Sequence, residues 1–103
     1  MIHELRHYIA VPGRLEALLQ RFRQHTFAVF QRLGFNVVAC WEAADGSDEF
    51  WYIVAWRDEA DMRRNWEILK ADPEWLEIKK DTERDGPLVV RIDSTLLRPL
   101  EMA

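Results

Sequence analysis

The stretch FNVVACWEAADGSDEFWYIVAWR, residues 35–57, decides the fold. Two apolar runs, 35–44 and 49–57, flank a short polar segment that contains Asp45-Gly46. Asp-Gly between apolar runs is a strong signal of a β-hairpin. Apolar side chains, many of them aromatic, occupy both faces of each predicted strand instead of alternating with polar ones. We therefore expect both faces of this hairpin to be covered.

Upstream of the hairpin, the sequence predicts a strand followed by a long helix. Residues 2–10 read as a strand that ends at Pro12-Gly13, because proline cannot donate to a sheet and glycine tolerates the turn. Residues 14–33 read as a helix that Gly34 ends as a C-terminal cap. Its apolar residues recur at spacings of three, four and seven, which gives one inward stripe: Leu15, Leu18, Leu19, Phe22, Val29, Phe30 and Leu33.

Downstream, two more helix starts precede a last strand. Asp58 is a predicted N-cap, and the helix that follows has an inward stripe of Met62, Asn65, Trp66 and Leu69. Asp72-Pro73 begins a second, short helix that runs to about Glu83, with Trp75 and Ile78 facing inward. Residues 88–97 are rich in Val, Ile, Leu and Thr and predict a strand.

The order strand, helix, strand, strand, helix, strand predicts a single α+β domain over residues 1–103. Its simplest form is a ferredoxin-like βαββαβ fold with a four-stranded antiparallel sheet. Helices can cover only one face of such a sheet. The chain carries 5 Trp, 5 Phe and 2 Tyr, a heavy aromatic load for 103 residues. We therefore expect a second copy of the same sheet to cover the other face, which makes the protein a homodimer.

Charge and composition exclude several partners. The chain has 14 Lys plus Arg against 18 Asp plus Glu, a net charge of −4 and a pI near 5.3, which argue against nucleic acid. No apolar run approaches the 18 residues of a membrane span, and residues 1–6 lack the apolar region of a signal peptide. A single cysteine cannot form an internal disulfide. We expect a cytoplasmic protein with neither nucleic acid nor membrane as partner.

Conventional motifs for cofactors, metals or nucleophiles are missing from the sequence. The four glycines are isolated, so they form neither a dinucleotide fingerprint nor a phosphate loop. His3 and His7 lie about 13 Å apart on a strand, too far for one metal ion. Cys40 reads as a small buried apolar residue in a strand. We expect no metal and no cofactor, and no catalytic residue can be assigned.

The first strand is the exception, because Glu4, Arg6 and Tyr8 share one face beside apolar strands. A charge in such surroundings must be paired. Glu4 and Arg6 lie about 6.8 Å apart along the strand and could form a buried ion pair with Tyr8 beside it. Alternatively, Arg6 and Tyr8 are convergent polar groups in an apolar pocket between sheet and helices.

Four further residues are candidates for that pocket. His25 lies on the edge of the inward stripe of the first helix and could be a boundary histidine or a catalytic base. Tyr52, Trp56 and Trp66 could wall the pocket or could be plain core. Which face of each strand looks toward the helices cannot be fixed from the pattern.

Several motifs in order along the chain resemble the NIPSNAP family. They are HELRHY at residues 3–8, PGRL at 12–15, His25, the strand end at Trp56, ADPEW at 71–75 and LRPL at 97–100. This resemblance implies a dimeric α+β barrel. The wider barrel superfamily includes cofactor-independent monooxygenases of the antibiotic-biosynthesis type and haem-degrading enzymes. Arg6 stands where the haem-degrading enzymes have a strand-one asparagine, which argues against haem chemistry.

Three functions remain open. The first is a homodimer that binds a small, partly apolar ligand, with Arg6 as the anchor for an anionic or carbonyl group. The second is a cofactor-independent monooxygenase or isomerase in which Tyr8 or His25 acts as general acid or base. The third is a protein–protein interaction module, which predicts no enclosed pocket.

Overall fold

The computed structural model describes residues 1–102. The predicted order of strands and helices is confirmed. The elements are β1 (Ile2–Ala10), α1 (Leu15–Arg21), the π-helical turn η1 (Phe22–Thr26), α2 (Phe27–Leu33), β2 (Asn36–Glu42), β3 (Glu49–Trp56), α3 (Glu59–Ala71), α4 (Pro73–Thr82) and β4 (Val89–Leu97). The predicted helix over residues 14–33 is one helical run interrupted by η1.

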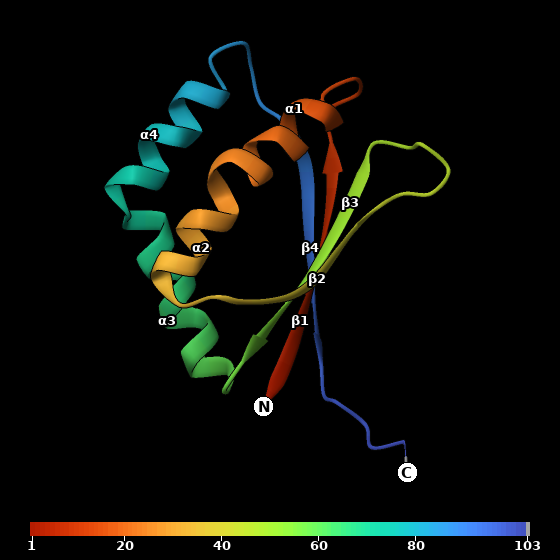
Figure 1. Ribbon diagram of the computed structural model, residues 1–103, viewed down its shortest axis with the longest axis vertical. Helices are drawn as coiled ribbons and strands as arrows, with labels where there is room; N and C mark the ends of the chain where they lie inside the picture. The colour runs from red at the N-terminus through yellow and green to blue at the C-terminus, as the bar shows by residue number, and fades with distance from the viewer. Residues whose placement is uncertain (103) are drawn as a thin grey trace.

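The four strands form one antiparallel sheet in the order β2-β3-β1-β4, as a ferredoxin-like α+β fold requires. All helices lie on one side of this sheet (Figure 1). In the centre of the sheet, Tyr8 of β1 is opposite Phe50 of β3 and Ile92 of β4. β1 is thus a central strand, and the side chains on its helix side lie between the sheet and the helices.

The helix ends follow from local chemistry that is visible in the sequence. The side chain of Asp58 accepts a hydrogen bond from the backbone N–H of Asp61 at 2.8 Å. Asp72 does the same for Trp75 at 2.9 Å, so both aspartates act as the predicted N-caps. Gly34 ends α2 with φ of 84°, a left-handed conformation that glycine adopts without steric cost.

Most of the aromatic side chains are buried by the chain's own helices. Phe50, Tyr52 and Trp56 of β3 all point to the helix side and are buried. Of the twelve rings, seven are buried in the core and three (Phe27, Trp66 and Trp75) are half-buried against it. Only the remaining two, Trp41 and Trp51, belong to the other side of the sheet. The helix-side rings of β3 are therefore covered within the single chain and do not themselves require a second subunit.

An irregularity in β2 changes the environment of Cys40. The register between β2 and β3 shifts between Val37 and Ala39, so Cys40 pairs with Tyr52 and turns toward the helix side. β2 is the edge strand, and Phe22 and Phe27 of the first helical run line a hollow beside Cys40 without burying it. Cys40 is exposed, so the prediction of a buried cysteine is wrong.

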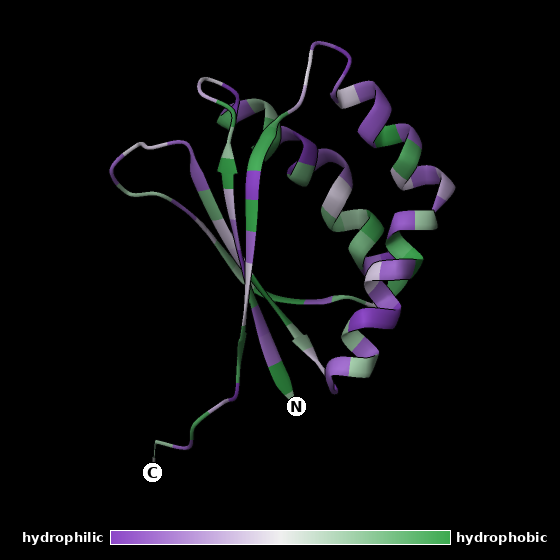
Figure 2. Ribbon diagram, turned by 180° about the vertical axis from the view of Figure 1, so that it is seen from behind, coloured by the Kyte–Doolittle hydropathy of each residue, from purple (hydrophilic) through white to green (hydrophobic). Residues whose placement is uncertain are grey.

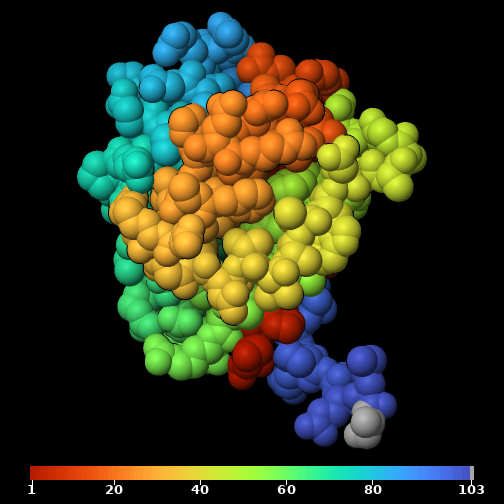
Figure 3. Space-filling model, in the orientation of Figure 1, coloured from red at the N-terminus to blue at the C-terminus, as the bar shows by residue number. Residues whose placement is uncertain are grey.

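We call the sheet surface opposite the helices the open face. Its residues alternate with those of the helix side along each strand and include His3, Leu5, His7, Ile9, Ala39, Trp41, Trp51, Ile53, Ala55, Thr95 and Leu97. In Figure 2 apolar segments occur along the strands that carry this face. After β4 the chain extends away from the body (Figure 3), and Leu100 and Met102 are exposed there. Among residues 1–102, no helix is long and apolar enough to cross a membrane.

Candidate functional site

A cavity of about 420 Å³ lies between the β1–β4 half of the sheet and the helices. Its volume falls within the range of small-molecule sites, about 300–1,000 Å³. The wall combines aromatic rings with charged side chains. Its residues come from β1, β4 and all the helices and include Arg6, Tyr8, Arg21, Phe22, Thr26, Phe30, Trp66, Leu69, Trp75, Lys79, Glu83 and Ile92. A second hollow, of about 510 Å³, lies on the open face beside Trp41 and Trp51, but it is shallow and open to solvent.

Below this cavity, the carboxylate of Glu4 is the centre of a buried hydrogen-bond network. Only 2% of Glu4 is exposed. Its Oε1 accepts the indole N–H groups of Trp56, at 2.9 Å, and Trp66, at 2.8 Å. Its Oε2 accepts the hydroxyl of Ser94 at 2.6 Å and lies 3.6 Å from Nη1 of Arg6. Glu4 therefore joins β1, β3, β4 and α3 and fixes the Trp66 ring at the cavity wall.

Arg6 lies above Glu4 and forms part of the cavity wall. Its guanidinium carbon is 4.3 Å from the centre of the Trp66 ring, a close cation–π contact. Burial acts to lower the pKa of Arg6, but the attraction and hydrogen bonds of the Tyr8 and Tyr52 oxygens outweigh it, so this pKa is raised. Arg6 is a permanent cation, and its buried Nε has no hydrogen-bond partner among the described residues.

A hydrogen bond between the hydroxyls of Tyr8 and Tyr52 fixes where their protons lie. The hydroxyls of Tyr8 and Tyr52 lie 2.8 Å apart, and Nη2 of Arg6 donates to Tyr8 at 3.3 Å. Burial raises the pKa of Tyr52 well above its ordinary value, so this phenol keeps its proton. Tyr52 is fully buried, and because its other neighbour Arg6 can only donate, the oxygen of Tyr8 is the one acceptor within its reach among the described residues. Its proton therefore goes to Tyr8, which leaves the O–H of Tyr8 free to donate toward the cavity.

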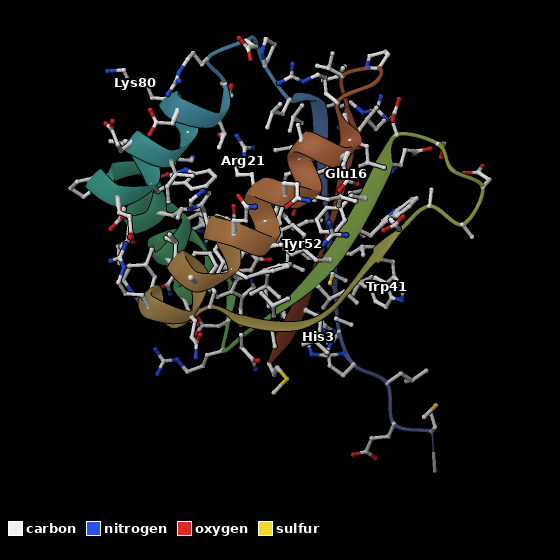
Figure 4. All side chains as sticks on the ribbon, turned by 45° about the horizontal axis from the view of Figure 1, so that its top comes forward. His3, Glu16, Arg21, Trp41, Tyr52 and Lys80 are labelled. Carbon is white, nitrogen blue, oxygen red and sulfur yellow. The ribbon has the colours of Figure 1, made fainter. Side chains whose placement is uncertain are left out.

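Arg21 resembles Arg6 in its surroundings. It is only 5% exposed, and its guanidinium carbon lies 5.3 Å from the centre of the Trp75 ring. Nη1 donates to Glu83 at 3.1 Å and to Thr82 at 3.3 Å. Figure 4 shows the side chain directed from the first helical run toward α4. Both arginines of the cavity thus stack on an indole and pair with one glutamate.

The π-helical turn η1 decides which residues of the first helical run reach the cavity. Its hydrogen bonds span five residues, as in the bond from the backbone N–H of Phe27 to the carbonyl of Phe22. One turn after Arg21, the inward position is taken by Thr26, whose hydroxyl donates to the Arg21 carbonyl at 3.3 Å. His25 lies one residue short of that position and is not part of the cavity wall. The expectation that His25 reaches the pocket is therefore wrong.

The seven residues selected from the sequence divide into three groups. Arg6, Tyr8 and Trp66 line the cavity. Glu4, Tyr52 and Trp56 lie beneath it and hold those three in place. His25 lies apart from both groups, so the structure brings together six of the seven.

The sequence interpretation missed Arg21 and Trp75 at the cavity. Charged and polar residues surround Arg21 in sequence, a pattern that is typical of a solvated helix face. The available signal was its position three residues after Leu18, on the inward stripe. Trp75 was predicted to face inward, but the sequence did not connect it with the first strand.

The described residues hold no cluster of three or more His, Cys, Asp or Glu side chains suited to a metal ion. The cavity offers flat apolar surfaces and several hydrogen-bond donors from different elements, which are features typical of small-molecule sites.

Comparison with known proteins connects this chain with one family. The NIPSNAP family model matches residues 3–103. An uncharacterised NIPSNAP-like domain protein from Burkholderia xenovorans is 24% identical, with a TM-score of 0.86 over 99% of this chain and 87% of that chain. A family protein of unknown function from Agrobacterium tumefaciens is also 24% identical, with a TM-score of 0.84 over 100% of this chain and 91% of that one.

More distant folds include an antibiotic biosynthesis monooxygenase. It is 12% identical, with a TM-score of 0.66 over 98% of this chain and 100% of that chain, so the likeness concerns the fold alone. No curated protein matches the sequence.

Proposed function

This chain belongs to the NIPSNAP family, and we propose that it is a homodimeric protein that binds a small, partly apolar ligand between its sheet and its helices. The observation that carries the proposal is the cavity over Arg6, Tyr8 and Trp66. Its size suits a small molecule, and its wall combines aromatic surface with a few fixed polar groups. The proposal includes a cytoplasmic location, supported by the lone, exposed Cys40.

The rigidity of the wall supports a binding role. Trp66 is held by its hydrogen bond to Glu4, and the Arg6 guanidinium lies between that carboxylate and the ring. A wall that is already ordered loses little conformational freedom when a ligand enters, which favours affinity.

The open face supports the homodimer. Leu5, Ile53 and Ala55 are half-buried although nothing lies over them in the single chain. Trp41 is 49% exposed and Leu97 is 41% exposed on the same surface. Large exposed apolar patches mark interaction sites, and a face that pairs with its own copy gives a closed two-fold interface. The partner in this proposal is a second copy of the chain.

The enzyme alternative has weaker support. A cofactor-independent monooxygenase or isomerase needs a proton donor or acceptor at the cavity, and His25 lies outside it. Tyr8 remains as a candidate for this role, with its O–H directed toward the cavity. The interaction-module alternative predicts no enclosed pocket, and a cavity of about 420 Å³ speaks against it.

Ligand binding is tested with a cavity-blocking variant. Ile92 lines the cavity from β4 and is 41% exposed, so Ile92→Trp should fill the space with little cost to the core. The control is Leu76→Trp on the outer side of α4, where Leu76 is 50% exposed. We expect the neutral probe 2-naphthamide to quench tryptophan fluorescence and raise Tm in the wild type and in Leu76→Trp. The ligand site is overturned if Ile92→Trp binds 2-naphthamide as well as the wild type does, or if the wild type does not bind it.

The dimer is tested by light scattering. The chain has a mass of 12.3 kDa, and we expect twice that mass at micromolar concentration. Ile53→Lys places a charge at the centre of the open face and should give a folded monomer or a much weaker dimer, whereas Ile68→Lys, at an exposed position of α3, should remain dimeric. A wild-type monomer at that concentration contradicts the proposal.

A further inference from the structure

The polar groups of the cavity wall that remain without a partner are mostly hydrogen-bond donors, and Oε1 of Glu83 is the exception among the described residues. The O–H of Tyr8 points there because Tyr52 and Arg6 both donate to its oxygen. Arg21 uses Nη1 for Glu83 and Thr82, and its Nη2 has no acceptor among the described residues. The indole N–H of Trp66 is already donated to Glu4. A molecule that fills this cavity must therefore supply acceptor oxygens.

The charge around the cavity is positive, which also suits a ligand that carries acceptor oxygens. Four cationic side chains line it, namely Arg6, Arg21, Lys70 and Lys79, against the single acid Glu83, with Glu4 beneath the wall paired to Arg6. The whole chain, by contrast, has a net charge of −4. A cavity with low-dielectric walls and cations concentrated in it attracts anions even when the whole molecule is acidic.

Arg21 is not explained by a structural role alone. Its bond to Glu83 links the first helical run to the end of α4, but this bond occupies one nitrogen of three. The buried Nε lacks any acceptor among the described residues, as does Nε of Arg6. Leaving guanidinium donors unpaired at a side chain that is 5% exposed has a free-energy cost. An anion that enters the cavity would remove much of that cost.

We infer that the ligand of this cavity is an amphipathic anion: a flat apolar body that carries a carboxylate or a similar oxyanion. The oxyanion accepts hydrogen bonds from the O–H of Tyr8 and from the guanidinium groups of Arg6 and Arg21. The apolar body lies against the rings of Trp66 and Phe22, which line the same space. Guanidinium groups bind planar oxyanions through two parallel N–H bonds, which gives the site its preference for charge. This inference rests on the proposed ligand site and names the ligand class.

The test compares two probes of nearly equal shape, 2-naphthoate and its neutral amide, by calorimetric titration of the wild-type protein. We expect the carboxylate to bind at least about tenfold more tightly, because a hydrogen bond to a charged group is worth more than one to a neutral group. Equal affinities would overturn the anion preference while leaving the ligand site intact. No binding of either probe would overturn both.

Variants then assign the preference to named side chains. Tyr8→Phe removes a donor that points at the cavity, and Tyr52→Phe is the matched control because Tyr52 does not line it. We expect Tyr8→Phe to lower the affinity for 2-naphthoate severalfold, and Tyr52→Phe to keep the preference for the anion. The reverse order contradicts the assigned proton positions.

Arg21 is tested in both directions, because Arg21→Gln removes a buried ion pair and could unfold the chain. Glu83→Gln keeps Arg21 and removes the negative charge that competes with the ligand for it, since Glu83 is the only carboxylate of the wall. We expect Arg21→Gln, where folded, to prefer the anion less than the wild type does, because only Arg6 and Tyr8 remain, and Glu83→Gln to bind 2-naphthoate more tightly than the wild type. An anion preference unchanged in Glu83→Gln, or undiminished in a folded Arg21→Gln protein, overturns the role of Arg21.

Discussion

Replacing Glu4 with glutamine removes the charge at the centre of the network beneath the cavity but keeps the shape of the side chain. The amide oxygen can still accept the indole N–H groups of Trp56 and Trp66, and the hydroxyl of Ser94 can reverse to accept from the amide nitrogen. What is lost is the negative charge that faces Arg6 at 3.6 Å. The substitution therefore isolates the charge of Glu4 from its packing.

The expected loss of stability follows from burial. Removing one partner of a buried ion pair costs about 3–5 kcal/mol, because the other charge remains buried. Arg6 is 17% exposed and keeps its contacts with Trp66 and Tyr8, so we expect the lower end of that range. For a domain of this size, a loss of about 3 kcal/mol lowers Tm by about 12–24 °C.

Urea denaturation measures this loss, and the protein concentration is held fixed because the stability of a dimer, as proposed for this chain, depends on concentration. Glu16→Gln is the control, because Glu16 is 71% exposed and its replacement should change stability by about 0.5 kcal/mol or less. The double variant with Arg6→Gln should lose less than the sum of the single losses, since both break the same pair. A Glu4→Gln protein as stable as the control would refute the view that this network holds the cavity wall.

Three further predictions concern other parts of the chain. Gly34→Ala should cost about 1–2 kcal/mol, seen as a lower Tm, because φ of 84° strains a residue with a Cβ although no atom lies within 4 Å of it. Asp72→Asn should lower Tm at neutral pH, because hydrogen bonds from Arg32 and from the Trp75 backbone lower the pKa of Asp72 below 3.8 and so stabilise the folded state while the carboxylate is charged. The difference in Tm between the variant and the wild type should disappear at a pH below the folded-state pKa, and a difference that persists there would contradict this. Burial raises the pKa of Tyr52, so the folded state holds this proton above pH 10, where the unfolded chain releases it, and the protein should lose stability as the pH rises above 10. Tyr52→Phe should lose less stability over the same pH range. Identical curves of Tm against pH for the two proteins would show that Tyr52 is not responsible.

The architecture was predictable because its signals are local. Asp58, Asp72 and Gly34 mark helix ends through contacts within a few residues, and Asp45-Gly46 marks the hairpin. The choice between the two faces of β3 was not predictable. Both faces are apolar in sequence, and only the packing of the helices decides that Tyr52 is buried while Trp51 lies on the open face.

The site was predictable only in part. Glu4, Arg6 and Tyr8 alternate on one strand, so their shared face follows from the geometry of a β-strand. Arg21 depends instead on a partner far along the chain, Glu83, which no local pattern connects with it. The π-helical turn that excludes His25 from the cavity cannot be read from an apolar stripe of ordinary helical spacing.

The central claim is that an anionic ligand binds in the cavity between the sheet and the helices. Nuclear magnetic resonance of ¹⁵N-labelled protein during titration with 2-naphthoate tests it most directly, because each indole and guanidinium N–H reports its own surroundings. We predict shifts in the indole signals of Trp66 and Trp75 and in the Nε–H signals of Arg6 and Arg21, while Trp41 and Trp51 of the open face stay unchanged. Shifts confined to Trp41 and Trp51, or no shift in any of these signals, would contradict the account.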